Sequence, residues 1–163
     1  TDLDEVWFVV SPQNPFKKST SLAHEFDRMD LVNAAIYDNY HLKACDIEFH
    51  MPKPSYTIDT LTYLSEKYPS KTFSLIVGQD NLKSFHKWKN AKKILEQYSL
   101  RVYPRPGAQP SDLLERPNVQ LINAPMIDIS ATFIRKSLKG NRSIKYMVPE
   151  SVIELIKSKK LYL

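Results

Sequence analysis

Residues 73–104 read FSLIVGQDNLKSFHKWKNAKKILEQYSLRVYP, and this stretch indicates the fold class. It begins with a short apolar run at 73–77, which is typical of a buried strand. One or two short helices are predicted between Asn81 and Gln97, and residues 100–104 predict a second strand. A strand, a helix and another strand in this order indicate parallel strands joined by a helical crossover.

The same alternation continues on both sides of this stretch. Further strands are predicted at 5–10, 43–50 and 119–124, and further helices at about 21–37 and 57–68, from Ala131 onward and after Pro149. We therefore expect an α/β fold with a mainly parallel sheet. Because no internal repeat or linker interrupts the pattern, residues 1–163 are expected to form a single domain.

The bulk composition limits the classes of partner. The chain has 163 residues and a net charge of +5, which fits an anionic ligand but is too small to favour nucleic acid. Its longest apolar run, Val6 to Val10, is too short to span a membrane. The single cysteine, Cys45, excludes an internal disulfide and favours a reducing compartment, so a cytoplasmic location is expected.

Polar segments follow the predicted strands where ligands bind in such folds. Ligands of parallel α/β sheets bind outside the carboxyl ends of the strands. SPQNPFKK (11–18), GQD (78–80), RPG (105–107) and DISAT (128–132) each come after a predicted strand. We expect these four segments to lie on one rim.

The segment DISATFIRKSL (128–138) predicts a capped helix with two faces. Ser130 is suited to cap its N-terminus, and Ile134 and Leu138 form an apolar stripe. Thr132 and Arg135, three residues apart, share another face beside the free N–H groups of the first turn, and this arrangement suits phosphate. An ordinary capped helix with a solvated arginine fits these residues equally well.

Other candidates at the rim also have two interpretations. Lys17, Lys18 and Arg105 could bind phosphate or be solvated loop residues. Gly78 would let a ligand approach the backbone closely. Asp80 could accept hydrogen bonds from ribose hydroxyls or cap the next helix.

Two further segments could each bind a ligand group. Phe85 and Trp88 could pack in the core, or a half-exposed Trp88 could stack on a heteroaromatic ring. Ser55 or Thr57 is predicted to cap the helix at 57–68, and the free N–H groups there could bind a carboxylate.

Four motifs occur in one order: PSYTIDTL, LIVGQDNLKSFHKW, RPG and ISATFIRKSL. Together they resemble the nicotinate-mononucleotide adenylyltransferase family of Rossmann-like nucleotidyltransferases, from about Val6 to the end of the chain. The resemblance implies a Rossmann-like, doubly wound, mainly parallel sheet with flanking helices. It implies an enzyme of NAD biosynthesis that joins ATP and nicotinate mononucleotide into nicotinate adenine dinucleotide and pyrophosphate, with Mg²⁺ bridging phosphate oxygens.

The resemblance also implies roles for single residues. The nicotinate mononucleotide would contact Thr57, Tyr56 and Trp88, with Trp88 stacked on the pyridine ring. ATP and its phosphates would contact Ser130, Thr132, Arg135, Arg105, Lys17, Lys18, Gly78 and Asp80. No protein ligand for a metal is implied.

One departure from the family's pattern concerns the N-terminal part. The family opens with a strand, a G-x-F-x-P turn and an H-x-G-H motif on the first helix, and none of these occurs here. We therefore expect this chain to lack the family's first strand and helix and to be inactive by itself. The strands at 5–10 and 73–77 are expected not to pair directly with each other. A non-catalytic nucleotide-binding module and a sister adenylyltransferase or cytidylyltransferase are the rival interpretations.

Overall fold

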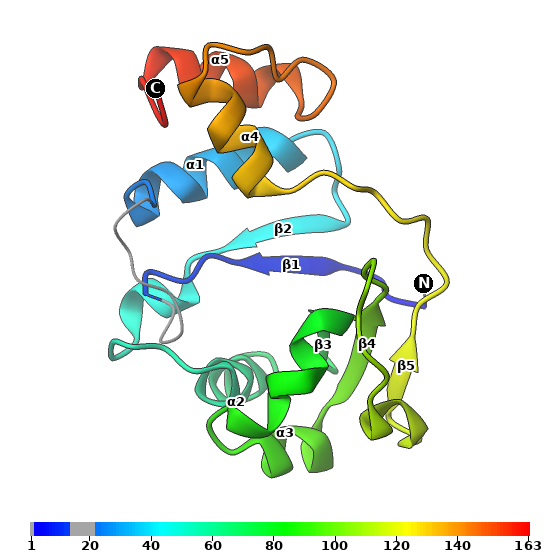
Figure 1. Cartoon of the computed structure of the whole chain (residues 1–163). Helices are drawn as coiled ribbons and strands as arrows, with labels where there is room; N and C mark the ends of the chain where they lie inside the picture. The colour runs from blue at the N-terminus through cyan, green and yellow to red at the C-terminus, as the bar shows by residue number, and fades with distance from the viewer. Residues whose placement is uncertain (1, 14–21) are drawn as a thin grey trace. The chain divides into compact units, whose positions relative to one another are not determined.

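The computed structural model describes residues 2–13 and 22–163 (Figure 1). Its strands are β1 (Val6–Val9), β2 (Leu42–Cys45), β3 (Ser74–Gly78), β4 (Ser99–Tyr103) and β5 (Val119–Leu121). Its α-helices are α1 (Glu25–Ile36), α2 (Thr57–Lys67), α3 (Ala91–Gln97), α4 (Ala131–Lys139) and α5 (Glu150–Ser158). Short 3₁₀ helices are η1 (Ile47–His50), η2 (Gln79–Lys87) and η3 (Asp112–Glu115).

The chain divides into two compact units, and each is described by itself. The first, called the middle unit, comprises residues 56–127, and the second, called the terminal unit, comprises residues 2–55 and 128–163. Strands β3, β4 and β5 pair in that order in the middle unit, and β1 pairs with β2 in the terminal unit. Every one of these pairs is parallel, as the alternation of strands and helices predicts.

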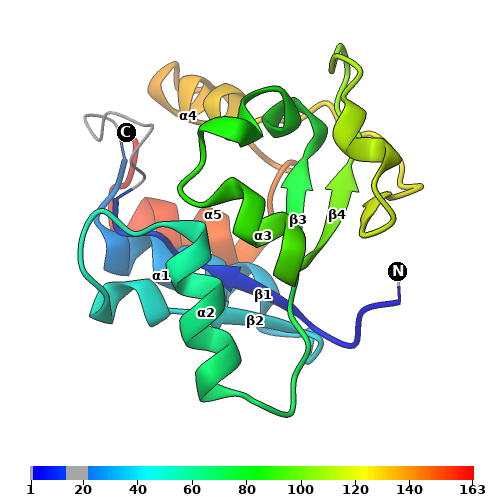
Figure 2. The ribbon, with the colours of Figure 1, turned by 90° about the horizontal axis from the view of Figure 1, so that it is seen from below.

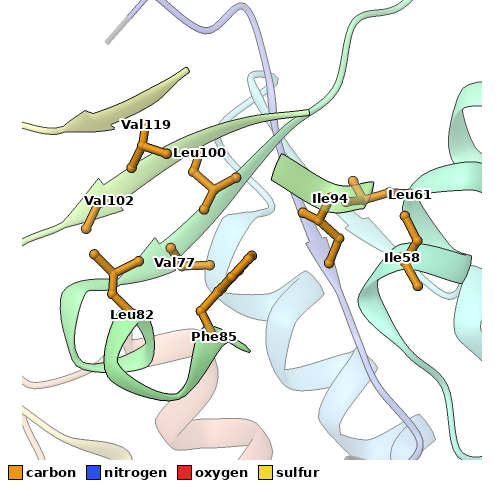
Figure 3. Close-up of a cluster of buried hydrophobic side chains, with 9 residues drawn as sticks. All are labelled: Ile58, Leu61, Val77, Leu82, Phe85, Ile94, Leu100, Val102 and Val119. Carbon is orange, nitrogen blue, oxygen red and sulfur yellow. The ribbon is translucent and has the colours of Figure 1, made fainter. Parts of the chain in front are cut away.

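The middle unit buries one face of its sheet under helices. Strands β3 and β4 run side by side in the same direction (Figure 2). Leu100 and Val102 alternate along β4 with the more exposed Arg101, and both are fully buried. Helices α2 and α3 and the 3₁₀ helix η2 supply the other side of this core (Figure 3), whose members are Ile58, Leu61, Val77, Leu82, Phe85, Ile94, Leu100, Val102 and Val119.

The terminal unit has its own apolar cluster among its helices. Its buried members are Ile144, Val152, Ile153 and Ile156, and Ile134 and Leu138 of α4 pack against them. Polar contacts join α1 to α5: the Ser151 hydroxyl donates to the Ala34 carbonyl at 2.6 Å, and Lys159 donates to Asp27 at 2.8 Å and to Asp30. The hydrogen bonds to these two carboxylates raise the pKa of Lys159 above its usual value.

Two of the predicted strands are shorter than expected. The strand predicted at 43–50 ends at Cys45, because Asp46 leaves the extended conformation (φ −96°, ψ 11°) and the chain continues as η1. The alternation beyond Cys45 instead reflects η1, which buries Ile47 and Glu48. The strand predicted at 119–124 pairs with β4 only from Val119 to Leu121.

Strand β1 is hydrogen-bonded to β2 in the terminal unit, and β3 is hydrogen-bonded to β4 in the middle unit. The expectation that β1 and β3 do not pair directly stays a prediction. The strand before SPQNPFKK lies in one sheet, and the strands before GQD, RPG and DISAT lie in the other. A single rim for all four segments stays a prediction.

The longest described α-helix, α1, has 12 residues. None of the helices in the described part of the chain is long and apolar enough to cross a membrane.

Candidate active site

The carboxyl ends of β3 and β4 bring Gly78, Asp80 and Arg105 together. Gly78 lies opposite Tyr103 in the parallel register, so the GQD and RPG segments leave the sheet at the same edge. Arg105 Nε lies 3.9 Å from Asp80 Oδ1, and its guanidinium lies 5.9 Å from the centre of the Tyr103 ring. The expectation that these two segments share an edge is therefore confirmed.

The edge is compact because Gly78 has no side chain. A Cβ atom at this position would overlap the carboxylate of Asp80 and would lie 3.4 Å from Arg105 Nε. One of the two predicted roles of Asp80, capping of the next helix, is wrong, because η2 begins at Gln79 and its N-cap residue is Gly78. Gly107 adopts a left-handed backbone (φ 71°), which glycine tolerates without strain in the RPG turn.

Helix α2 begins without a side-chain cap. Its N-cap residue is Tyr56, which makes no capping hydrogen bond. The prediction that Ser55 or Thr57 caps the helix is wrong, because the Ser55 hydroxyl donates instead to the buried carboxylate of Glu48 at 2.5 Å and Thr57 is already the first helical residue. The first-turn N–H groups and the positive end of the helix dipole therefore suit an anionic group.

Trp88 comes directly before a lysine that contacts this helix start. Its indole stacks on the buried ring of Phe85, with ring centres 4.9 Å apart and planes 29° apart, and it is half-buried. The next residue, Lys89, reaches α2: its Nζ lies 2.7 Å from Asp59 Oδ2 and 4.6 Å from the centre of the Tyr56 ring. Because Tyr56 and Asp59 flank Thr57, the middle unit brings Thr57 and the segment carrying Trp88 into one region, as expected.

The start of α4 has the two predicted faces. Ser130 Oγ accepts a hydrogen bond from the Phe133 N–H at 3.1 Å, which confirms the predicted cap. Arg135 Nη2 donates to Thr132 Oγ1 at 3.4 Å on the exposed face. This face joins a hydroxyl and a guanidinium at the helix start, an arrangement that suits phosphate.

The remaining two predicted phosphate ligands, Lys17 and Lys18, lie outside the described residues. The described candidates therefore form one group in each unit. The middle unit combines an open helix start, a half-buried indole and a polar strand edge, which suits a ring-bearing nucleotide. The terminal unit contributes the phosphate-type face of α4.

Sequence reasoning missed three side chains near these groups. Asp59 and Lys89 are paired across 30 residues of chain; Asp59 lies in the PSYTIDTL motif without an assigned role, and Lys89 belongs to no motif. The hydroxyl of Tyr103 donates to the Pro125 carbonyl at 2.7 Å while its ring lies under Arg105. Only the folded arrangement makes these residues partners, so periodicity could not identify them.

Comparisons with known proteins identify the family. The Cytidylyltransferase-like family model matches residues 1–137. A protein of Cytophaga hutchinsonii named "Probable nicotinate-nucleotide adenylyltransferase" is 60% identical over 162 residues, which cover 99% of this chain and 84% of that protein. The chain belongs to the nicotinate-nucleotide adenylyltransferase family. A Flavobacterium johnsoniae protein of the same name is 45% identical over 163 residues, with the same coverage of both chains.

A solved structure shows the fold expected of this adenylyltransferase family. The chain matches the Plasmodium falciparum nicotinic acid mononucleotide adenylyltransferase complexed with NaAD, with a TM-score of 0.78 and 22% identity. The match covers 98% of this chain and 82% of that one. The Rossmann-like nucleotidyltransferase fold, with parallel sheets and flanking helices, is therefore confirmed.

Proposed function

We propose that this protein transfers the AMP moiety of ATP to nicotinate mononucleotide, giving nicotinate adenine dinucleotide and pyrophosphate in NAD biosynthesis. The observation that carries the proposal is the 60% identity to a relative of that name over 99% of this chain. We also propose that residues 1–163 belong to one nucleotidyltransferase domain, since the relatives align over both units.

The middle unit would bind the pyridine nucleotide. Trp88 offers a half-buried indole face that can stack on the pyridine ring, and its support on Phe85 keeps that face in place. The uncapped first turn of α2, at Tyr56 and Thr57, offers N–H groups to the nicotinate carboxylate. A neutral carboxamide would gain less from the helix dipole, which favours the acid form of the mononucleotide.

Each unit carries residues that the family resemblance assigns to ATP. Gly78 allows a close backbone approach, and Asp80 offers carboxylate oxygens to ribose hydroxyls. Arg105 would contact the phosphates from the same edge. Ser130, Thr132 and Arg135 would bind the triphosphate from α4, together with Lys17 and Lys18.

The proposed reaction needs no protein nucleophile. A phosphate oxygen of the mononucleotide attacks the α-phosphorus of ATP, and the bond from that phosphorus to the oxygen bridging to the β-phosphate breaks, so pyrophosphate leaves. The protein contributes alignment of the two phosphates and cations that stabilise the negative charge on them. Guanidinium groups such as that of Arg135 suit this task because they stay protonated.

We propose Mg²⁺ as the metal that accompanies ATP. Among the described residues, no three His, Cys, Asp or Glu side chains lie close enough together to hold a metal ion. The described side chains therefore offer no complete set of metal ligands. The ion would be held by phosphate oxygens and water, as Mg²⁺ commonly is at such sites. We also propose a cytoplasmic location, which the single cysteine, Cys45, supports because it cannot form a disulfide within the chain.

Pyrophosphate release tests the proposed function. We expect residues 1–163 joined to the family's N-terminal strand and H-x-G-H helix to release pyrophosphate only when both ATP and nicotinate mononucleotide are present. Nicotinate adenine dinucleotide should form in equal amount and be identified by mass, and residues 1–163 by themselves should release no pyrophosphate. A parallel reaction with nicotinamide mononucleotide measures the preference for the acid over the amide form of the mononucleotide. A parallel reaction with CTP measures the preference for ATP over CTP. Binding of both substrates without turnover would favour a non-catalytic nucleotide-binding module, and turnover of CTP alone would favour a sister transferase.

A further inference from the structure

We propose that Lys89 is a positioning residue that holds the segment carrying Trp88 against the first turn of α2. This inference rests on the proposed function, in which Trp88 stacks on the pyridine ring of nicotinate and the start of α2 binds its carboxylate. It assigns a role to a side chain outside the motifs considered above, and to its partner Asp59.

The segment that carries Trp88 is a short connection between two helical elements. Helix η2 ends at Lys87 and α3 begins at Ala91. Between them, Trp88 has an extended backbone (φ −72°, ψ 146°) and Asn90 adopts a left-handed one (φ 51°). Backbone hydrogen bonds hold the main chain of Trp88 locally, because its N–H donates to the Phe85 carbonyl at 2.9 Å and its carbonyl accepts from the Ala91 N–H at 3.2 Å. No strand pairing involves this segment, so side-chain contacts connect it to α2.

One set of contacts places the indole over the core of the middle unit. Phe85 is 1% exposed and forms part of the apolar cluster, and Trp88 stacks on it. This stack determines the height of the indole above the core. A stacked aromatic pair still permits sliding of one ring over the other, because offset geometries are similar in energy.

Lys89 supplies the second set of contacts, which is directed at α2. Its ammonium donates to Asp59 at 2.7 Å and lies 4.6 Å from the centre of the Tyr56 ring. Tyr56 is the N-cap residue of α2, and Asp59 lies in its first turn. Lys89, which follows Trp88 directly, therefore contacts residues on both sides of Thr57.

The Lys89–Asp59 pair also affects the helix start itself. An acidic residue in the first turn of a helix can interact with the free N–H groups there. Asp59 is instead paired with Lys89, and the Ser55 hydroxyl is directed to Glu48. Pairing of Asp59 with Lys89 thus favours an α2 start that is open to the carboxylate of a ligand.

Binding of nicotinate mononucleotide, measured with the full chain, tests this inference. Trp7 is the only other tryptophan, so a Trp7→Phe background leaves Trp88 as the sole indole fluorophore. In this background we expect Lys89→Met to weaken binding of nicotinate mononucleotide by about five-fold, the effect expected of an exposed ion pair and a cation–π contact together. The KM for ATP should stay within about two-fold of the value for the Trp7→Phe parent, since other residues are proposed to contact ATP.

Four further variants separate positioning from general damage. Lys89→Arg keeps a cation over Tyr56 and should restore most of the affinity. Asp59→Asn should resemble Lys89→Met, and the double variant should be no weaker than either single one, because both remove the same contact. Lys87→Met removes an exposed lysine two residues earlier and should leave the affinity unchanged.

A measurement without ligand separates this inference from the proposed function. Quenching of Trp88 by acrylamide should increase in Lys89→Met and not in Lys89→Arg. Unchanged quenching and unchanged affinity in Lys89→Met would overturn the positioning role while the parent still binds the mononucleotide. A parent that binds no nicotinate mononucleotide would overturn the proposed function and the role of Lys89 in it together.

Discussion

Arg135 shows how one residue combines local and functional demands. It lies in α4, five residues after the N-cap Ser130, and within the described part of the chain its guanidinium donates to Thr132 rather than to an acidic partner. A guanidinium bound only to a neutral hydroxyl keeps most of its charge available to an anion.

Replacing Arg135 with alanine should weaken ATP binding far more than it lowers stability. Charge-assisted hydrogen bonds contribute about 1.5–3 kcal/mol, so the Kd for ATP should rise by about ten-fold or more. The free energy of unfolding should change by about 0.5 kcal/mol. Calorimetry at moderate salt measures the affinity, and Lys136→Ala, which removes the same charge from the neighbouring position, is the control. Equal affinities of wild type and Arg135→Ala would remove α4 from the phosphate site.

Gly78 gives a prediction of the same kind at the strand edge. Gly78→Ala should raise the KM for ATP several-fold, because the new methyl group displaces Asp80 and crowds Arg105. Its free energy of unfolding should change little, about 0.5 kcal/mol, because the Asp80 side chain is 63% exposed and can rotate away. Gly107→Ala should instead lower stability without crowding a neighbour. A Cβ at Gly107 would meet no atom within 4 Å, but the φ of 71° strains an alanine by about 1–2 kcal/mol. Steady-state kinetics and urea unfolding of both variants check these expectations, and an unchanged KM in Gly78→Ala would contradict the first.

At the scale of elements, helix α4 depends on its cap and helix α2 does not have one. The hydroxyl of Ser130 satisfies the Phe133 N–H, whereas α2 begins at Thr57 with no side-chain acceptor. Helices of 9 and 11 residues are too short to be stable alone, so packing of their apolar faces stabilises both. The cap adds to this packing only in α4.

Ser130→Ala should lower the free energy of unfolding by about 0.5–2 kcal/mol, the usual effect of losing an N-cap. Ser130→Asn should retain most of the stability, since its carbonyl oxygen can accept the same hydrogen bond. Urea unfolding followed by circular dichroism measures both variants. If asparagine destabilises the protein as much as alanine does, the hydrogen bond to Phe133 does not stabilise α4.

At the scale of the whole molecule, the chain builds two separate apolar clusters. The cluster of the middle unit and that of the terminal unit have no residue in common. Ile94 is fully buried in the first and Ile153 is 7% exposed in the second. Substitutions in the two clusters should therefore lower the free energy of unfolding independently.

Ile94→Val and Ile153→Val should each lower the free energy of unfolding by about 0.5–1.5 kcal/mol. The double variant should match the sum within about 0.5 kcal/mol, because the two sites have no common packing partners. Chemical unfolding of the wild type and the three variants in urea measures this additivity. A deviation from the sum above about 1 kcal/mol would show that the two clusters are energetically coupled.

The sequence by itself determined the type and order of most elements and the family. Period-two and period-3.6 patterns depend only on neighbours along the chain, which is why β3, α2 and β4 appear close to their predicted positions. The cap at Ser130 and the Thr132–Arg135 face are equally local. Candidate site residues were recognisable because their motifs are short and contiguous, although their roles stay predictions.

Only the tertiary structure decided what depends on distant partners. Ser55 leaves α2 uncapped because Glu48, on another element, offers a buried carboxylate to its hydroxyl. Strand β2 stops at Cys45 where Asp46 turns the chain into η1, although the alternating pattern continues. Lys89 meets Asp59 across 30 residues because α2 and α3 pack together on one sheet face. A hydrogen bond or ion pair between separate elements exists only after those elements have packed, so no local pattern encodes it.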